Sequence, residues 1–425
     1  MKLMNLKGTD DFLPNEQIIR NKIINTLRNH FESYGYMPIE TPILNYYDLL
    51  SYKYSSDAEI LSEIYKLKDQ GDRNLGLRYD LTVPFCKVIG IHKEIRMPFR
   101  RYEIGKVFRN GPVKLGRTRE FYQCDVDVVG IDNRFIEAEQ ILMAIEGYKK
   151  LGIDVIVKYN NRKLMSGLIL EAGIEEANIP SVIGVIDKME KIELDELIEN
   201  LEKLNISKDK IDKLLEYFKY DFNEYLNMFQ STNNNYIKEG LEELIELNNY
   251  LKELNIIKDC IFTPTLARGL TIYTGVVFEF YDKEKRINSA IGAGGRYNKI
   301  ITDFMNNGES YPAIGLSFGL EPIYAILKEE TKESLIDIYL VPLDTNIETL
   351  KLATNLRENN INVLLEMNKK KVGKCFEYAE SMNIHYISII GSNEIESGIL
   401  RIKNMQTKEE KEVKIEEIME FLKNN

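Results

Sequence analysis

Polar residues with catalytic potential are concentrated between Val107 and Gly130, where the sequence reads VFRNGPVKLGRTREFYQCDVDVVG. The apolar start, the turn containing Gly and Pro, and the alternating return predict two antiparallel strands joined by a long loop. Along the second strand, Gln123, Asp125 and Asp127 fall on one side, because successive side chains alternate. A strand side that faces a core is apolar, so this row of amide and carboxylate groups is either solvated or lines a polar pocket.

Basic residues flank this row. Arg109, Arg117 and Arg119 belong to the same hairpin, and a planar, permanently charged guanidinium suits phosphate or carboxylate ligands. The preceding stretch, Ile91 to Arg101, is also basic and predicts either a solvated face or a path for a polyanion beside the site. None of the three histidines stands near a serine or cysteine in a nucleophile setting, so we expect the chemistry to rest on arginines and carboxylates.

A second candidate lies in Leu77–Pro84, which reads LRYDLTVP. Asp80 and Thr82 are two residues apart, so in a strand they project to one face, where a carboxylate and a hydroxyl together can hold an amino group. Alternatively, Asp80 or Thr82 caps a helix that follows Pro84. The two interpretations are compatible.

Two glycine-containing stretches follow later in the chain. In Thr265–Glu279, Arg268 precedes Gly269, which permits close backbone approach, and the run then continues as a strand. Gly292–Tyr297 reads GAGGRY and lacks the third glycine of the dinucleotide-binding motif. We therefore expect these glycines to let a ligand lie against a strand or turn.

Taken together, these segments resemble the histidyl-tRNA synthetases, a family of class II aminoacyl-tRNA synthetases. The hairpin, with Phe-Arg, Gly-Arg-x-Arg-Glu-Phe and Gln-x-Asp-x-Asp, is similar to class II motif 2. A helix followed by the proline-containing strand Met37–Leu44 resembles motif 1, the dimer interface of the family. Tyr311–Pro322 resembles motif 3, and Arg268–Gly275 resembles the histidine-specific Arg-Gly-Leu-Asp-Tyr-Tyr-Thr-Gly.

The resemblance implies the site residues. Arg109 and Arg268 would be the catalytic pair that grips the α-phosphate and the substrate carboxylate. Those implied for histidine are Asp80, Leu81, Thr82, Arg109, Gln123, Asp127, Arg268, Ile272 and Tyr273. Those implied for ATP are Arg109, Arg117, Gly315 and Gly319. Mg²⁺ would bridge the phosphates, through ligands that the sequence leaves unknown.

The sequence departs from the family pattern at four positions. Thr271 and Ile272 replace an Asp and a Tyr, Pro322 replaces the Arg that ends motif 3, and Gly111 replaces an acid of motif 2. The last two favour an alternative, a histidine-binding paralogue that regulates ATP phosphoribosyltransferase and does not aminoacylate. The C-terminal domain, which that paralogue usually lacks, and the two retained arginines favour the synthetase.

Length and pattern predict the domains. An α+β catalytic domain on an antiparallel sheet is expected over residues 1–327, with a mostly helical insertion at about 165–256. Alternating strands and helices over 334–425 predict an α/β domain, which resembles the anticodon-binding domain of class IIa synthetases. Its lysine cluster is either solvated or a phosphate footprint for tRNA. The lysines are Lys369, Lys370, Lys371 and Lys374.

Composition limits the alternatives. A net charge of −11 argues against a protein that coats nucleic acid non-specifically. It does not exclude a nucleic-acid partner, because a local basic patch can dominate a small contact surface. Four scattered cysteines support neither zinc nor a disulfide framework, and no segment is apolar enough to cross a membrane. We expect a cytoplasmic homodimer that activates histidine with ATP to histidyl-adenylate and transfers it to the 3′ end of tRNA(His).

Overall fold

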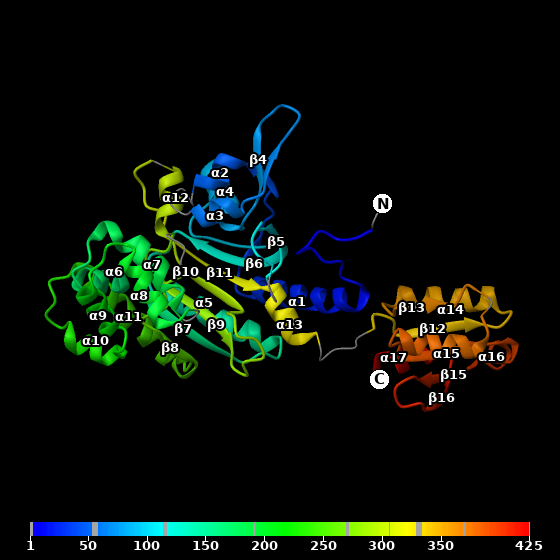
Figure 1. Cartoon of the computed structure of the whole chain (residues 1–425). Coiled ribbons are helices and arrows are strands. Elements are labelled where there is room, and N and C mark those ends of the chain that lie inside the picture. The colour runs from blue at the N-terminus through cyan, green and yellow to red at the C-terminus, as the bar shows by residue number, and fades with distance from the viewer. Residues whose placement is uncertain are drawn as a thin grey trace. The chain divides into compact units, whose positions relative to one another are not determined.

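The computed structural model describes residues 3–52, 58–113, 117–189, 192–268, 272–305, 307–328, 334–368 and 370–424 (Figure 1). The chain divides into two compact units. The first comprises Met1–Asp11 and Lys22–Ile326, and the second comprises Phe12–Asn21 and Leu327–Asn425. Within the described residues, no helix is both long and apolar enough to span a bilayer.

The first unit is built on an eight-stranded sheet with the order β1-β5-β6-β11-β10-β9-β7-β8. Its strands are β1 (Met37–Pro38), β5 (Phe99–Phe108), β6 (Glu120–Val129), β7 (Val155–Asn161), β8 (Cys260–Phe262), β9 (Val276–Asp282), β10 (Gly292–Arg296) and β11 (Ala313–Gly319). All neighbouring pairs from β5 to β7 are antiparallel, and only the edge strands β1 and β8 pair in parallel. The expected antiparallel sheet is confirmed, and the proline-containing β1 lies at an edge, where a missing N–H is tolerated.

One face of this sheet is apolar. It carries Val126 and Phe318, which are fully buried, and it packs against α1 (Pro14–Ser33) and α5 (Phe135–Lys150). Phe31 of α1 and Tyr148 of α5 contact the Phe318 ring at centroid distances of 5.3 and 4.9 Å. Burial of these aromatic side chains stabilises the sheet and leaves only the opposite face for polar chemistry.

Shorter elements surround the sheet. A small sheet has the order β2-β4-β3. The elements are β2 (Leu44–Tyr46), α2 (Tyr47–Tyr52), α3 (Ala58–Glu63), β3 (Lys66–Lys68), β4 (Asn74–Leu77), α4 (Thr82–Ile91), α12 (Asn298–Met305) and α13 (Leu320–Leu327). Helix α4 packs against α12 through a buried cluster that includes Phe85 and Ile301.

The described chain between β7 and β8 is helical, and Figure 1 shows these helices gathered together. They are α6 (Arg162–Glu171), η1 (Glu176–Asn178), α7 (Ile179–Ile186), α8 (Leu194–Glu202), α9 (Lys208–Tyr217), α10 (Phe222–Met228), α11 (Asn235–Glu253) and η3 (Ile257–Asp259). The helical periodicity has a direct packing cause: α11 buries Leu244, Leu247 and Leu251, three or four residues apart. A capping box of Asp221 and Glu224 begins α10.

The second unit is an α/β domain with the sheet order β13-β12-β14-β15-β16. Strands β13, β12 and β14 are parallel, and β15 and β16 add antiparallel pairs. The elements are β12 (Ile338–Pro342), α14 (Asn346–Glu358), β13 (Val363–Leu365), α15 (Val372–Ser381), β14 (Tyr386–Ile390), α16 (Ser392–Ser397), β15 (Ile399–Asn404), β16 (Glu410–Lys414) and α17 (Ile418–Asn424). Two apolar clusters, around Leu340 and Tyr339, form its core.

His30 lies in the core beneath the apolar face of the first unit and is 1% exposed. Its Nε2 donates to the Met143 carbonyl at 2.7 Å, and Lys150 Nζ lies 2.9 Å from Nδ1. Burial lowers the pKa of His30 below its usual 6.5, and Lys150 lowers it further against the Met143 hydrogen bond. The folded protein therefore holds a neutral imidazole.

We predict that His30→Gln reduces the acid sensitivity of stability. Below pH 6.5 the unfolded chain binds a proton at His30 that the folded chain resists, so this contribution to stability is lost as the pH falls from 6.5 toward the lowered pKa. The wild type should therefore lose more stability than the variant between pH 7 and pH 5.5. Denaturant unfolding at both pH values measures the difference, and equal losses would contradict the prediction.

Candidate active site

A buried ion pair forms the centre of the polar face. Arg101 on β5 is fully buried, and its Nη2 lies 2.5 Å from Asp127 Oδ2 on the neighbouring β6. The guanidinium stacks over Phe85 at 4.4 Å and donates to the Leu81 carbonyl at 3.3 Å. The alternative in which Arg101 belongs to a surface path for a polyanion is therefore wrong, because the strand turns this side chain inward.

A second buried pair fixes the turn between β4 and α4 to the sheet. Arg78 Nη1 lies 2.8 Å from Glu103 Oε1 and 2.7 Å from the Thr41 carbonyl, and Nε donates to the Lys106 carbonyl at 2.7 Å. Gly105 is bare here because a Cβ on it would lie 2.3 Å from Arg78 Nη2. Hydrogen bonds to several acceptors compensate for the burial of both charges.

Asp80, Leu81 and Thr82 follow β4 and lead into α4 rather than forming a strand. The carboxylate of Asp80 accepts a hydrogen bond from the Val83 N–H at 3.0 Å, within the first helical turn. Asp80 therefore caps the first turn from the position before the N-cap residue, Leu81. The helix begins at Thr82 and contains Pro84, whereas the sequence predicted a helix that follows Pro84. Asp80 is also close enough to Asp125 of β6 to act on it electrostatically, so the cap stands beside the row of carboxylates.

Asp125 lies between Gln123 and Asp127, opposite Glu103 on β5 and Ser317 on β11. Gln123 Nε2 donates to Ser317 Oγ at 3.0 Å, and the Ser317 hydroxyl bonds to Asp125. Burial raises the pKa of Asp125 to about 7; Arg101 opposes this shift, and the Asp127 charge adds to it. Asp125 Oδ1 and Gln123 Oε1 are buried acceptors that no described residue satisfies, which calls for a ligand with N–H donors.

Arg268 is held on a loop beside the same face. Arg162 Nη1, at the start of α6, donates to the carbonyls of Ala267 at 3.0 Å and Arg268 at 3.3 Å, and Asn160 Nδ2 donates to the Leu266 carbonyl at 3.0 Å. Burial lowers the pKa of Arg162 to about 10, which leaves it charged at neutral pH. The backbone of Arg268 has a φ of 49°, a conformation that these anchors maintain.

The Arg268 side chain provides donors for an anion. Its guanidinium lies 5.0 Å from the Tyr273 ring, and Nη1 is a buried donor without a partner among the described residues. On the C-terminal side of residues 269–271, the Thr274 N–H donates to the Arg296 carbonyl at 2.8 Å. Arg296 is itself buried against Glu137 at 2.6 Å. The loop is thus attached to the sheet on both sides, although residues 269–271 lie outside the described structure.

Glycines clear space for side chains of this site. A Cβ on Gly315 would lie 2.1 Å from Asp127 Oδ1, and one on Gly295 would lie 2.9 Å from the Tyr273 ring. Tyr297 also donates its hydroxyl to Asp127. Gly315 therefore lies beside the carboxylate row, and the side chains of Asp127 and Tyr297 occupy the space that a Cβ at position 315 would need. Ile272, by contrast, is 7% exposed and belongs to the apolar cluster around Phe85.

Two more arginines lie in the connection between β5 and β6, at the end of the hairpin nearest to Gln123. Arg109 is stacked between the rings of Tyr79 and Phe121, at 4.3 and 4.9 Å. Arg117 Nη2 contacts Glu63 Oε1 at 3.0 Å, with the arginine side chain half exposed. Stacking orients a guanidinium without consuming its in-plane donors, so Arg109 keeps most of them for an anion.

The end of β11 lies against α13. A Cβ on Gly319 would lie 3.1 Å from Pro322 Cδ, and Glu321 accepts from the Tyr122 N–H at 3.2 Å. The residue that replaces the motif 3 arginine therefore packs beside the bare backbone of Gly319. Pro322 makes an apolar contact at this position and, unlike the arginine, carries no charge.

Lysines of the second unit are partly engaged. Lys370 Nζ lies 2.9 Å from Glu366 and Lys374 Nζ lies 2.7 Å from Glu377. Lys371 is exposed directly before α15, and Lys369 lies outside the described residues. The footprint stays a prediction, in which Lys371 has the fewest competing contacts among the lysines described.

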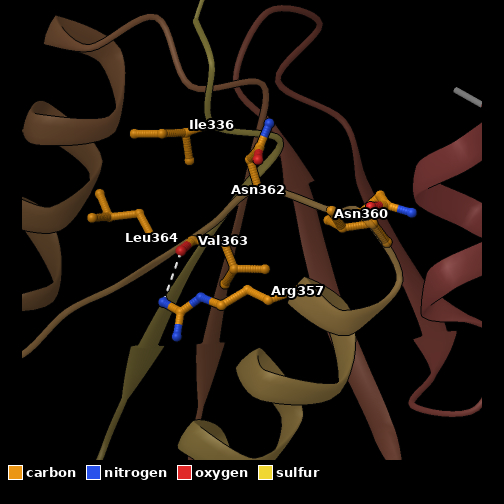
Figure 2. Close-up of a pocket in the computed structure, with 7 residues that line it drawn as sticks. Ile336, Arg357, Asn360, Asn362, Val363 and Leu364 are labelled. Carbon is orange, nitrogen blue, oxygen red and sulfur yellow. Dashed lines mark hydrogen bonds between the residues drawn. The ribbon is translucent and has the colours of Figure 1, made fainter.

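The second unit also has an open cavity of about 480 Å³, shown in Figure 2. It is lined by Ile336, Arg357, Asn360, Ile361, Asn362, Val363 and Leu364. Arg357 donates to the Val363 carbonyl at 2.9 Å, so its guanidinium is already engaged. The described residues that line the cavity include no carboxylate, thiol or imidazole.

Comparison with known proteins agrees with this geometry. A sequence profile described as histidyl-tRNA synthetase matches residues 8–323, and one described as an anticodon-binding domain matches residues 337–425. The chain belongs to the histidyl-tRNA synthetase family. A Bacillus cereus protein named histidine–tRNA ligase 1 is 44% identical and covers 98% of this chain and 95% of its own. A histidine–tRNA ligase of Clostridium tetani is 33% identical, and the alignment covers 99% of this chain and 98% of that protein.

Solved structures of synthetases have the same fold. Histidyl-tRNA synthetase from Nostoc sp. PCC 7120 aligns with a TM-score of 0.87 and 28% identity, over 100% of this chain and 99% of the other. A Bacillus halodurans structure, described as an ATP phosphoribosyltransferase regulatory subunit/histidyl-tRNA synthetase, aligns with a TM-score of 0.76 over 92% and 98%. Its identity of 22% shows the shared fold alone.

Several residues of this site were missed by reasoning from sequence. Arg78, Arg101 and Glu103 are buried ions, and their ion pairs join segments that are separate in the sequence. A usable signal existed for the last two, since Arg101, Glu103 and Gly105 alternate with apolar residues along β5. For Arg162, whose partners lie about one hundred residues later, the sequence offers no local signal.

We predict that Asp125→Asn stabilises the protein at pH 8 and weakens histidine binding. The folded pKa of about 7 lies above the unfolded value of 3.8, so wild-type stability is fully present below pH 4 and decreases as the pH rises through 7. The uncharged variant avoids this loss, which is on the order of 1–2 kcal/mol. Unfolding at pH 5 and pH 8 measures it, with the exposed Asp154→Asn as a control; a variant that is no more stable at pH 8 contradicts the prediction.

Proposed function

We infer that this chain is a histidine–tRNA ligase. It activates L-histidine with ATP to histidyl-adenylate and transfers the histidyl group to the 3′ end of tRNA(His). The observation that carries this function is that Gln123 Oε1 and Asp125 Oδ1, two buried acceptors on β6, lie on the sheet face beside the loop of Arg268, whose Nη1 is a buried donor. None of these three atoms has a hydrogen-bond partner among the described residues. An amino acid that reacts with ATP satisfies both the acceptors and the donor.

The amino acid would bind by its two polar ends. Asp80 and Thr82 are proposed to hold the α-ammonium group, and Gln123, Asp127 and Tyr273 to surround the imidazole. The unsatisfied Gln123 Oε1 supports this arrangement, since it accepts an N–H. Leu81 takes part through its backbone, whose carbonyl already orients Arg101. The burial of Ile272 supports a role in the apolar wall rather than a polar contact.

Adenylate formation requires the histidine carboxylate to attack the α-phosphorus. Arg268 and Arg109 are proposed to neutralise the charge that develops there, with Arg117 directed to the outer phosphates and Gly319 beneath the nucleotide. Gly315 is proposed to act indirectly, by leaving space for Asp127. Catalysis by placement and charge neutralisation needs no proton transfer from a side chain.

We propose that Mg²⁺ accompanies ATP and neutralises phosphate charge. The described residues contain no group of three histidine, cysteine or carboxylate side chains able to hold a metal ion. Phosphate oxygens and water would therefore supply most ligands, which is the usual arrangement for Mg²⁺ in nucleotide sites.

We also propose a homodimer, a tRNA footprint at Lys369–Lys371 and Lys374, and a cytoplasmic location. Exposed apolar side chains on the edge strand β1 and on β2 support the dimer: Met37, Leu44 and Tyr46 are 60%, 49% and 58% exposed. The four free cysteines support a reducing compartment.

The alternative, a regulatory histidine-binding protein, is less well supported. The anticodon-binding profile matches the second unit, and the relatives named histidine–tRNA ligase cover nearly the whole chain. Pro322 and Gly111 are the features that favour it.

We expect ATP–pyrophosphate exchange to be supported by histidine alone among the twenty amino acids. Exchange measures the reversal of adenylate formation and needs no tRNA, so it separates activation from transfer. Binding of histidine without any exchange would contradict the ligase and favour the regulatory protein. Exchange with a different amino acid would contradict the assigned specificity.

We expect Arg268→Ala to reduce exchange by at least tenfold without unfolding the protein. Loss of the guanidinium removes charge neutralisation in the transition state, and tenfold corresponds to about 1.4 kcal/mol of barrier. Steady-state exchange rates and the melting temperature are to be compared with the wild type. A smaller loss of rate, at an unchanged melting temperature, would exclude Arg268 from the catalytic pair.

A further inference from the structure

Glu63 is a buried acid that joins three separate segments of the first unit. It ends α3, and its side chain is 7% exposed. Its Oε2 accepts from the Tyr79 hydroxyl at 3.0 Å, its Oε1 contacts Arg117 Nη2 at 3.0 Å, and its carbonyl accepts from the Asn110 N–H at 2.8 Å. A carboxylate buried to this extent requires such partners, so its position is well determined.

The first connection runs to Arg109. Tyr79, which Glu63 fixes through its hydroxyl, places its ring 4.3 Å from the Arg109 guanidinium. The Tyr79 carbonyl also accepts from Arg109 Nε at 3.3 Å. One tyrosine thus orients Arg109 by stacking and by a hydrogen bond, and Glu63 determines how that tyrosine stands.

The second connection runs to Arg117, and the pair is asymmetric. The Arg117 side chain is 50% exposed, whereas Glu63 is almost fully enclosed. Because half of the Arg117 side chain is exposed, a phosphate can reach its guanidinium from the solvent side. Glu63 stays in place because Tyr79 still binds it.

The backbone at Gly111 is shaped to this acid. A Cβ on Gly111 would lie 2.3 Å from Glu63 Oε1 and 2.9 Å from its carboxyl carbon. Any larger residue at 111 would displace the carboxylate. The bare position and the neighbouring Asn110 N–H therefore fit the loop after β5 onto the end of α3.

We propose that Glu63 is a positioning residue for ATP, which orients Arg109 through Tyr79 and holds Arg117 ready for the polyphosphate. This rests on the proposed function, in which these two arginines bind the nucleotide. Glu63 acts through its neighbours and need not touch ATP. Its effect should appear in ATP binding and not in histidine binding.

The test measures ATP affinity directly by calorimetry, and the KM values for ATP and histidine in pyrophosphate exchange. The variants are Glu63→Ala, Glu63→Gln and Gly111→Ala, with Glu284→Ala as a control. Glu284 also pairs with an arginine, at 3.5 Å, but is 68% exposed. We expect Glu63→Ala and Gly111→Ala each to weaken ATP binding at least tenfold, with the KM for histidine within twofold of wild type. Glu63→Gln keeps an acceptor for the Tyr79 hydroxyl, so its ATP affinity should lie between that of these two variants and that of the wild type.

ATP affinity within twofold of wild type in folded Glu63→Ala and Gly111→Ala would overturn the inference. So would an equal rise of both KM values, which indicates a general structural defect. If Glu63→Ala does not fold, Gly111→Ala and Glu63→Gln decide by the same criteria. Absence of exchange in the wild type would contradict the proposed function and leave the ATP affinities to judge Glu63; absence of ATP binding in the wild type would overturn both.

Discussion

The ion pair between Arg101 and Asp127 is the constraint on which the rest of the site depends. Both side chains lie on the polar face of the sheet, and Arg101 is fully buried. Such a pair gains little net stability, because desolvation offsets the Coulombic attraction, but removal of one partner typically costs 3–5 kcal/mol. The pair therefore forces its surroundings to supply hydrogen bonds, and Leu81 and Tyr297 supply them.

This arrangement leaves an excess of negative charge. Asp80, Asp125 and Asp127 share the region with Arg101. Burial raises the pKa of Asp125 to about 7, and the charges of Asp127 and Asp80 add to this shift while Arg101 opposes it. A cationic or N–H-donating ligand would compensate the buried carboxylate, so the same group that lowers stability would favour binding of such a ligand. Stored instability of this kind is common where function requires buried charge.

The anion-binding side follows a different design. Arg109 is oriented by aromatic rings, and Arg268 by a loop that Asn160 and Arg162 fasten to the sheet. Among the described residues, neither guanidinium pairs with a buried carboxylate, which supports the proposal that both arginines bind an anion. Pro322 and Gly111 lack the charges that the family pattern carries there, and at Gly111 the carboxylate of Glu63 fills the space.

The features that depend on local periodicity could be predicted from the sequence. The hairpin, the shared side of Gln123, Asp125 and Asp127, the helices between β7 and β8, and the α/β character of the second unit all follow from the alternation or helical spacing of neighbouring side chains. The family was also identifiable, since its motifs are contiguous stretches of chain. These properties need no knowledge of what packs against what.

The positions and partners of the buried charges become apparent only in the tertiary structure. Arg101 reads as one of several surface arginines until the register of β5 and β6 pairs it with Asp127. The burial of Ile272 in an apolar cluster likewise becomes visible only in the packed structure. Glu63 meets Gly111 although they lie 48 residues apart. Burial and electrostatic environment are set by contacts between distant segments, and a pattern within one segment does not encode them.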